Sequence, residues 1–313
     1  MNRSKNIKFI ILMLVISLTG IHVSAQQFPL YSQYYQNRYI LNPGVAGSIK
    51  DFTPVRLSIH KQWLNVNESP STQYLTAHQK LRNEHVGIGG MIFHDSFGPI
   101  RNLGMNFTYA YHLELDRDLH LGLGLTAMLM QYRLSLEQED FYGFEPILTN
   151  ERLRIIVPDA HFGAYLYHDE DFWAGFSITQ LFQTHMKLTG TWQEKSNQLV
   201  RHYHLMAGYN INFPYSQNFE LVPSVLVKTT EVTKPQLDIN LKMVFYEDFW
   251  MGMGLRHDDS FVAMIGLTFD QYYFAFSHDF TFTDISRVTN GSEELSFGWN
   301  IQDGRIGQRS FFE

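Results

Sequence analysis

The stretch Leu119-His120-Leu121-Gly122-Leu123-Gly124-Leu125-Thr126 decides the fold class, because leucine alternates in it with small or polar residues without interruption. Successive side chains of a β-strand point to opposite faces of the sheet, so this stretch predicts a strand with one apolar and one polar face. The same alternation returns in three further segments. They are residues 205–213, 237–245 and 294–301.

Working outward from these segments, we expect about fourteen strands and an all-β fold. In lipid every backbone polar group must be satisfied internally, so strands cross a membrane only as a closed barrel. Its outer face is then apolar and its lumen polar, which is the alternation found here. The fold predicted is a transmembrane antiparallel β-barrel. Its expected strands are 54–63, 71–81, 85–94, 101–115, 119–133, 158–168, 171–181, 201–213, 218–229, 235–246, 249–257, 260–269, 272–281 and 292–301.

The lengths of the connections support the barrel. Every second connection is short and most of these are charged, as expected for periplasmic turns. The two longest connections, 134–157 and 182–200, belong to the other set and would face outward. A soluble β-sandwich could also give alternating strands, but it has no reason to sort its loops in this way. The short connections are residues 82–84, 116–118, 169–170, 214–217, 247–248 and 270–271.

The N-terminus predicts a secretion signal. Arg3, Lys5 and Lys8 precede an apolar run over residues 9–18, and Val23-Ser24-Ala25 offers small residues for cleavage after Ala25. The apolar run is shorter than the roughly 20 residues that a spanning helix needs. The chain of 313 residues has no cysteine, which excludes disulfides and thiol chemistry, and its formal charge of −7 makes nucleic-acid binding unfavourable.

Residues 26–48 differ from the rest of the mature chain. They read QQFPLYSQYYQNRYILNPGVAGS, rich in aromatic and amide side chains and without clean alternation. Disordered segments are poor in aromatic residues, so we expect a packed segment that plugs the lumen or docks a partner, starting in the periplasm. The predicted organisation is a signal peptide at 1–25, this plug or docking segment at 26–52, the barrel at 53–301 and a tail at 302–313.

Four neighbouring histidine–acid pairs raise the question of catalysis. They are His94-Asp95, His168-Asp169, His257-Asp258 and His278-Asp279. Adjacent residues of a strand face opposite sides of the sheet, so such pairs are not expected to share a proton. The sequence also has no serine elbow, no histidine set with metal-ligand spacing and no phosphate loop. We therefore predict no catalytic residues, no metal site and no cofactor.

Four short motifs follow one another in the mature chain. They are Tyr31-Ser32-Gln33-Tyr34 with residues 41–48, Gln62-Trp63 with residues 69–73, residues 87–89 with 95–99, and residues 290–296. In their order and spacing they resemble the PorP/SprF family of the type IX secretion system of Bacteroidetes, whose opening signature the first of them resembles. Two positions depart from the family pattern, since Gly44 replaces an alanine and Glu293 stands where histidine is common.

The resemblance implies an outer-membrane component of that system, which exports or retains proteins such as a gliding adhesin or virulence cargo. It implies contact with outer-membrane lipid and with either the periplasmic ring proteins PorK and PorN or a large surface adhesin. Asp95 and Gly98 are also expected to form a tight turn. The positions that match family motifs, and are thus candidates for partner binding or for the plug, are Tyr31, Ser32, Gln33, Tyr34, Asn42, Pro43, Gly47, Trp63, Pro70, Asp95, Gly98, Gly291, Ser292 and Glu294.

Two other functions fit a barrel of this size. A transport channel for small hydrophobic or polar solutes, of the fatty-acid-transporter kind, would use the N-terminal segment to fill a wide lumen. A barrel hydrolase, the weaker alternative, would assemble its catalytic residues across strands.

Overall fold

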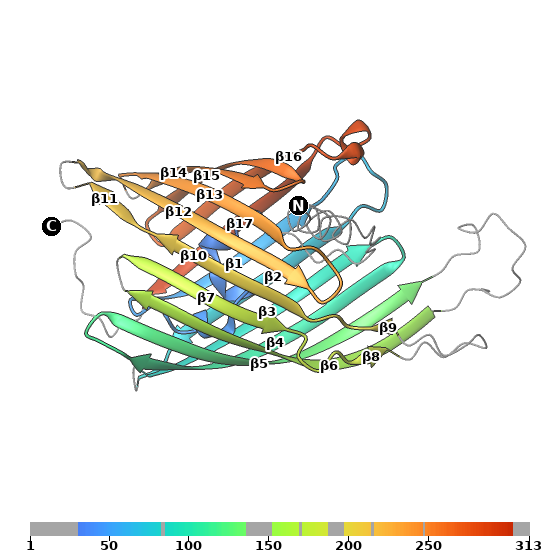
Figure 1. Cartoon of the computed structure of the whole chain (residues 1–313), viewed down its shortest axis with the longest axis horizontal. Helices are drawn as coiled ribbons and strands as arrows, with labels where there is room; N and C mark the ends of the chain where they lie inside the picture. Colours follow the sequence, from blue (N-terminus) through green and yellow to red (C-terminus); the bar gives the residue numbers. More distant parts are fainter. Residues whose placement is uncertain are drawn as a thin grey trace, which may run out of the picture.

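The computed structural model describes residues 31–82, 85–135, 152–168, 171–186, 197–213, 216–246 and 248–302. One antiparallel sheet closes on itself to form a barrel (Figure 1). Two short strands, β8 (His185–Met186) and β9 (Asn197–Gln198), pair only with each other. The barrel strands are β1 (Phe52–Lys61), β2 (Ser71–Lys80), β3 (Val86–Phe97), β4 (Ile100–Glu114), β5 (Leu119–Ser135), β6 (Arg152–His168), β7 (Phe172–Thr179), β10 (His202–Tyr209), β11 (Ile211–Phe213), β12 (Ser216–Thr230), β13 (Gln236–Phe245), β14 (Phe249–Arg256), β15 (Ser260–Phe269), β16 (Tyr272–Thr281) and β17 (Ser292–Gln302).

The order of the strands confirms the predicted barrel. Strands that follow each other in the chain are neighbours in the sheet, and β1 closes the barrel by pairing with β17. β10 pairs with β7 on one side and with β12 on the other. β11 continues β10 after a break at Asn210, so the two segments fill one position and the barrel has fourteen.

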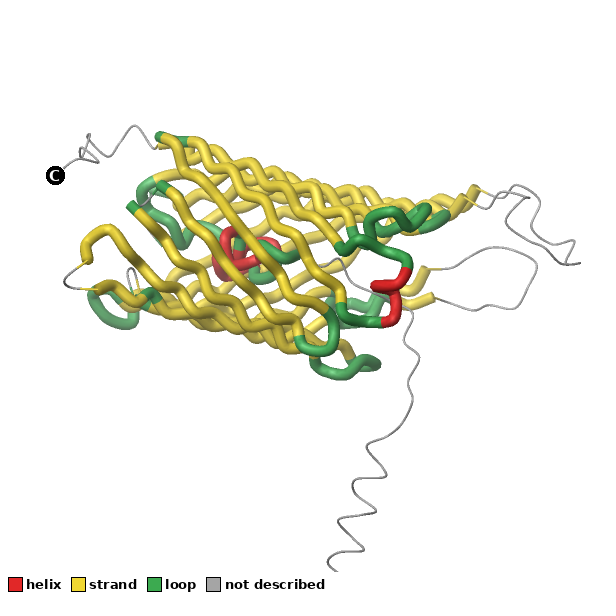
Figure 2. The backbone as a smooth tube through the Cα atoms, turned by 90° about the horizontal axis from the view of Figure 1, so that it is seen from above, coloured by secondary structure: helices red, strands yellow, loops and turns green. Residues whose placement is uncertain are grey.

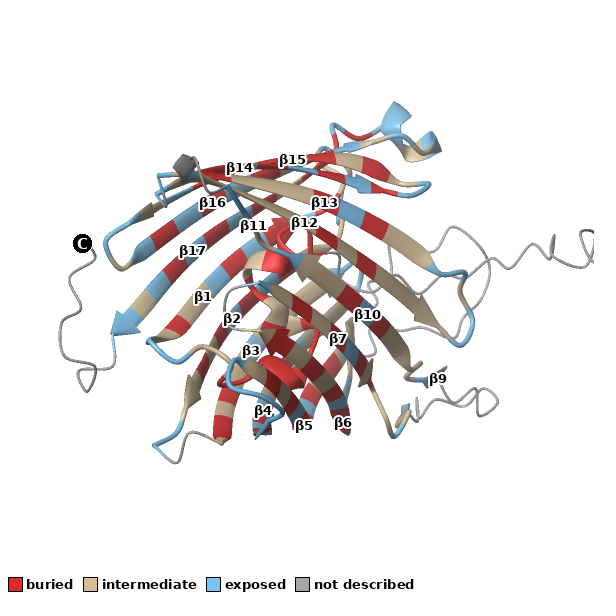
Figure 3. Cartoon of the chain, turned by 60° about the vertical axis from the view of Figure 1, so that its left-hand side comes forward, coloured by how far each residue is buried: buried red, intermediate tan, exposed pale blue. Residues whose placement is uncertain are grey.

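The period of two that the sequence predicts is present in the exposure of the side chains. Along β5, Leu123 and Leu125 are exposed at 37% and 57%, whereas Gly122, Gly124 and Thr126 between and beside them are buried. Figure 3 shows the same alternation of buried and exposed residues along most of the strands. The outward face is therefore apolar and suited to lipid, while the lumen carries the small and polar residues.

Short turns join the strands at one end of the barrel, and most of the longer connections lie at the other end. By the rule for bacterial barrels, the short turns mark the periplasmic end. β6 is the largest difference from the expected strands, because it begins at Arg152 and not at Pro158. β7 pairs only with Phe162–Tyr167 of β6, so Pro158 lies where β6 has no paired strand on that side and its missing N–H removes no ladder bond.

Inside the lumen lies the segment that we call the plug, residues 31–48. It contains the 3₁₀ turns η1 (Tyr34–Gln36), η2 (Arg38–Ile40) and η3 (Pro43–Val45), drawn in red within the barrel in Figure 2. Its tyrosines and leucine form a buried apolar cluster with wall residues such as Trp250 and Met206. The described part of the chain holds no helix long and apolar enough to span a membrane.

The plug runs in the opposite direction to the expected one. Tyr31 to Gln33 lie beside the outer ends of β16 and β17, and Gly47 lies beside the periplasmic ends of β2 and β3. The plug thus runs through the lumen from the outer end to the periplasmic end, and β1 then returns along the wall to the outer end. The sequence had suggested a start in the periplasm. The predicted signal peptide and all of the predicted tail except Gln302 lie outside the described residues.

Candidate functional site

The outer end of the plug is bound to the carboxylate of Glu294, which is fully buried in the lumen. The backbone N–H groups of Ser32 and Gln33 donate to Glu294 Oε2 at 2.7 and 3.3 Å. From the wall, Ser58 Oγ and Tyr74 OH donate to its Oε1 at 2.8 and 3.2 Å. One carboxylate therefore accepts four hydrogen bonds and joins the plug to β1, β2 and β17.

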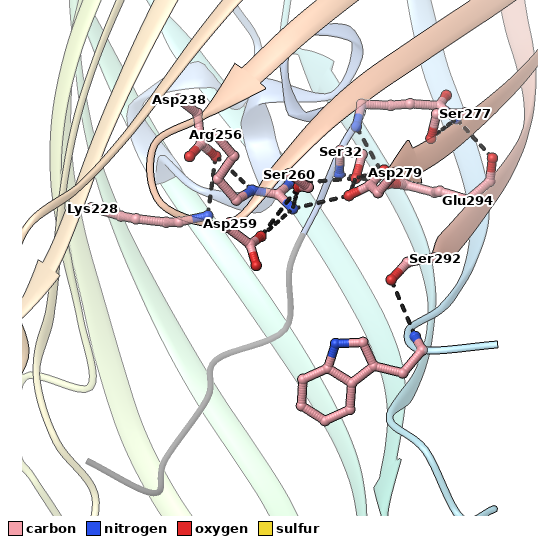
Figure 4. Close-up of polar contacts among 12 residues, drawn as sticks. Ser32, Lys228, Asp238, Arg256, Asp259, Ser260, Ser277, Asp279, Ser292 and Glu294 are labelled. Carbon is pink, nitrogen blue, oxygen red and sulfur yellow. Dashed lines mark hydrogen bonds and ion pairs between the residues drawn. The ribbon is translucent and has the colours of Figure 1, made fainter. Parts of the chain in front are cut away.

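Beside Glu294 lies a cluster of buried charges (Figure 4). Arg256 Nη1 donates to Asp279 Oδ2 at 2.9 Å and to Asp259 Oδ2 at 3.1 Å, and its Nε donates to Asp238 Oδ2 at 3.4 Å. Lys228 Nζ donates to the same oxygen of Asp238 at 3.1 Å. Ser32 Oγ donates to Asp279 at 2.8 Å, so the plug is a member of the network. A buried charge is tolerated when it is paired and hydrogen-bonded, as these are.

Tyrosines fill the middle of the lumen. Tyr39 OH bonds to Thr108 Oγ1 at 2.8 Å, Tyr34 OH accepts from Asn240 Nδ2 at 3.1 Å, and Tyr31 packs edge-on against Tyr74 with ring centroids 5.3 Å apart. Burial raises the pKa of both Tyr34 and Tyr39 to about 12. Both phenols are therefore neutral at physiological pH.

The periplasmic half of the plug is held by a tight turn against wall glycines. Asn42 caps η3 by accepting from Gly44 N–H at 2.8 Å, and its Nδ2 donates to the carbonyl oxygens of Ala164 at 2.9 Å and Phe176 at 3.3 Å. Gly47 has a φ of +82°, which favours glycine. A Cβ would overlap the plug's backbone or Asn42 at five wall positions. They are Gly87, Gly122, Gly124, Gly163 and Gly175.

A second group of motif residues forms the outer rim. Trp63 N–H donates to Ser292 Oγ at 3.1 Å, and Leu64 N–H donates to Gly291 O at 2.7 Å. Pro70 O accepts from Gln62 N–H at 2.9 Å, which closes the loop 62–70. In this loop Trp63, Asn65 and Glu68 have positive φ angles of 52°, 68° and 54°. This strained loop is thereby fixed to the end of β17.

Asp95 and Gly98 do not both lie in a turn, contrary to the expectation. Gly98 does, with a φ of +50°, and its N–H donates to Glu68 O of the rim loop at 3.1 Å. Asp95 lies on β3, which continues to Phe97, and it accepts from Thr72 Oγ1 at 2.7 Å. The strand is longer than expected because the pairing of β3 with β4 persists to Phe97 and Ile100.

The structure therefore sorts the predicted positions into two connected groups. The plug group lies in the lumen and comprises Tyr31, Ser32, Gln33, Tyr34, Asn42, Pro43, Gly47 and Glu294. The rim group comprises Trp63, Pro70, Asp95, Gly98, Gly291 and Ser292. Ser292 and Glu294 connect the groups, since they are two residues apart on β17 and both are buried.

Sequence reasoning missed Arg256, Asp238, Asp279 and Lys228. Their lumen-facing positions in the alternation were a usable signal, because a charged residue there must find a partner inside the barrel. Of the four histidine–acid pairs, Asp169 lies outside the described residues. His257 and Asp258 lie in the β14–β15 turn with Nδ1 and Oδ2 3.2 Å apart, so the strand argument against a contact is wrong for this pair. In the described residues no three acidic or histidine side chains are placed to hold a metal ion.

The comparisons with known proteins agree with this architecture. The family described as "Type IX secretion system membrane protein PorP/SprF" matches residues 23–299. No curated protein sequence matches the chain. Among solved structures, the CymD monoaromatic hydrocarbon channel is similar with a TM-score of 0.50 at 10% identity, covering 88% of this chain and 94% of that one.

Two more solved barrels are similar over most of their length. A Pseudomonas aeruginosa FadL homologue has a TM-score of 0.47 at 9% identity, with 80% of this chain and 90% of that chain covered. The translocator domain of the autotransporter NalP from Neisseria meningitidis has a TM-score of 0.43 at 10% identity, with 87% and 96% covered. At such low identities the likeness concerns the fold alone.

Proposed function

Because the chain belongs to the PorP/SprF family of type IX secretion system membrane proteins, we propose that this outer-membrane barrel supports the export or surface attachment of other proteins by direct protein–protein contact. The observation that carries the proposal is the plug, which occupies the lumen and is hydrogen-bonded to wall strands on all sides of the barrel. The wall strands that it contacts through hydrogen bonds include β2, β4, β6, β7, β13, β15, β16 and β17.

The plug argues against a solute channel as the main function. A space beside it, lined by Tyr39, Pro43 and Thr126 among others, measures about 20 Å³, which is room for roughly one water molecule. A solute could pass only if bonds such as those from Ser32 and Gln33 to Glu294 were broken first. The plugged barrel is better suited to serve as a rigid membrane platform.

Catalysis is also disfavoured by the bonding of the polar groups. The buried carboxylates of Asp238 and Asp279 share Arg256, and Ser32 Oγ donates to Asp279. These groups hold the plug and wall together. The proposed role is therefore non-enzymatic and requires no cofactor.

For the partner, we favour a secreted surface protein, such as a large adhesin, bound at the outer rim. Five of the family-motif positions of the barrel wall gather there: Trp63, Pro70, Gly98, Gly291 and Ser292 lie in or beside the outer connections. The motif residues 87–89 lie at the periplasmic end of β3, where Gly87 and Gly89 pack against the plug. A loop fixed in a strained conformation presents a constant surface to a partner. Contact with the ring proteins PorK and PorN on the periplasmic side is the alternative.

The proposal is tested by affinity purification of the tagged full-length chain from outer membranes in mild detergent, with mass spectrometry of the bound proteins. We expect a large surface protein to be recovered, and its recovery to fall when Trp63→Ala and Leu64→Asp disrupt the rim. The matched control is Arg117→Ala together with Asp118→Ala in a periplasmic turn, which should leave recovery unchanged.

Other outcomes have definite meanings. Recovery of PorK and PorN, lost in the turn variant and kept in the rim variant, would assign the barrel to the core machine. Recovery of no secretion protein, combined with solute-dependent conductance of the purified barrel in planar bilayers, would replace the proposal by the transport channel.

A further inference from the structure

Three arginines lie side by side on the outward face of the barrel. The strand register pairs Arg101 of β4 with Arg133 of β5, and Arg133 with Arg154 of β6. Neighbouring strands are about 4.8 Å apart, so the row spans about 10 Å from its first to its last Cα. We call it the arginine row.

The parity of the strands places these side chains on the lipid side. On β4 the exposed residues Leu103 and Met105 share the parity of Arg101, and on β5 the exposed Leu129 shares that of Arg133. On β6, Ile156 is 62% exposed and lies two residues after Arg154, on the same face. Alternate residues line one face of a sheet, so the row faces away from the lumen.

The row also marks the outer edge of the apolar band. On each of the three strands the lipid-facing residues are apolar through most of the wall. The arginine is the first or second lipid-facing residue beyond the last apolar one, counted toward the outer end of the barrel. The last apolar residues before the row are Leu103, Leu129 and Ile156. Arg101 and Arg154 lie near the start of β4 and β6, and Arg133 lies near the end of β5, so the row is at the outer end of all three strands. This places it at the level of the headgroups of the outer leaflet.

The arrangement needs an anion. Like charges directly opposite each other on neighbouring strands are destabilising. Within the described ranges none of the three arginines has a carboxylate partner; Arg101 donates to the carbonyl oxygens of Gly98 and Ile100, and Arg133 donates to Gln131 Oε1 at 3.4 Å. Elsewhere at the outer end arginines do have such partners, namely Glu231 for Arg201 at 3.3 Å and Asp284 for Arg287 at 3.4 Å.

We propose that the arginine row is a binding site for the phosphate groups of an anionic glycolipid in the outer leaflet. A guanidinium presents a planar fork of donors that matches phosphate oxygens, and its aliphatic stem can lie along the apolar surface while the charge reaches the headgroup. The flanking row positions on β2 and β3 are Ser71 and Ser96, which add hydroxyl groups and no negative charge.

The site is tested by native mass spectrometry of the purified full-length chain, titrated in detergent with lipid A that carries both phosphates. Dephosphorylated lipid A, inorganic phosphate and poly-glutamate are the comparison probes. The triple variant R101Q, R133Q and R154Q is compared with a control triple, R201Q, K234Q and R287Q, which removes the same charge at outer-end positions outside the row. Heat-modifiable migration in gels verifies that each variant is a folded barrel.

We expect one bound lipid A, held at least about tenfold more tightly than its dephosphorylated form, since charge-assisted bonds to phosphate would be lost. The triple variant should bind both lipids equally, whereas the control triple should stay within about twofold of the unmodified chain. R133K keeps the charge without the fork and should give intermediate affinity, which tests the site even if the triple variant does not fold. Unchanged binding by the triple variant, or displacement of lipid A by inorganic phosphate or poly-glutamate at equal concentration, would overturn the proposal.

Discussion

The substitution Glu294→Ala tests whether a single carboxylate holds the outer end of the plug. In the native chain Glu294 Oε2 accepts from the backbone N–H groups of Ser32 and Gln33. Removing it leaves these two buried plug donors without an acceptor, at about 1–3 kcal/mol each, and also leaves Tyr74 OH of the wall without its partner. Ser58 keeps Ser296 Oγ and Leu295 O as partners, so the largest cost falls on the plug. The plug should thus be destabilised by about 2–6 kcal/mol, which raises the population of its undocked form about 30-fold to about 20,000-fold.

Hydrogen–deuterium exchange of the purified barrel, read by mass spectrometry over residues 31–48, measures this population. Exchange should accelerate along the whole plug, including amides bonded within it such as those of Asn42 and Val45. The matched control is Glu293→Ala, whose side chain is 43% exposed and lies 3.5 Å from His278. If Glu294→Ala accelerates exchange only at Ser32 and Gln33, or if Glu293→Ala has an equal effect, the carboxylate does not hold the plug.

Three further predictions follow from the lumen. Gly124→Ala places a methyl group against the backbone of Pro43 and should lower the stability of the docked plug by about 1–3 kcal/mol, whereas Gly90→Ala, whose added carbon would lie 3.8 Å from Asn106 O, should be neutral in urea unfolding of the detergent-solubilised barrel. Arg256→Ala leaves Asp238 and Asp279 buried without their shared cation and should cost about 3–5 kcal/mol in the same assay, while Arg287→Ala at an 82% exposed site should change nothing measurable. Burial raises the pKa of Tyr34 and Tyr39 to about 12, above the ordinary value of 10, so their contribution to docking is complete below pH 10 and declines as pH rises through 12. Hydrogen–deuterium exchange of the plug, corrected for its intrinsic pH dependence, should therefore be constant from pH 7 to 9. An increase within that range would contradict the assigned burial.

The strands could be predicted from the sequence because each strand carries its own alternation of apolar and polar residues. No information about the other strands is needed. Leu121, Leu123 and Leu125 are separated by residues of the other face, so both the strand and its orientation follow from local chemistry. β6 was predicted to begin at Pro158, whereas the strand begins at Arg152. A proline fits inside this strand because the pairing with β7 covers only residues 162–167, so Pro158 has no ladder partner on that side. Such an exception depends on the length of a neighbouring strand, which local sequence does not contain.

The plug was predicted as a packed segment from its aromatic residues, but its direction was predicted wrongly and its anchors were not predicted. Ser32 and Glu294 are separated by 262 positions, and Ser32 and Asp279 by 247. Their contact depends on how the barrel closes and on the stagger of every strand between them, so an error in one register would misplace all later partners. The alternation does show that Asp238 faces inward, but it does not show that Arg256 will meet it.

The link between the rim and the plug limits how a partner could act on this barrel. Ser292 accepts from the Trp63 N–H of the rim loop, and two residues further along β17 Glu294 accepts from the plug. A partner that binds the rim more tightly when the plug is docked must stabilise the docked plug by the same factor, because coupling between two sites is reciprocal. A partner that instead prefers the undocked form must supply the free energy that the plug's bonds now provide, among them the two from Ser32 and Gln33 to Glu294. Plug exchange measured with and without the bound partner therefore distinguishes a platform, whose plug stays protected, from a gate, whose plug is released.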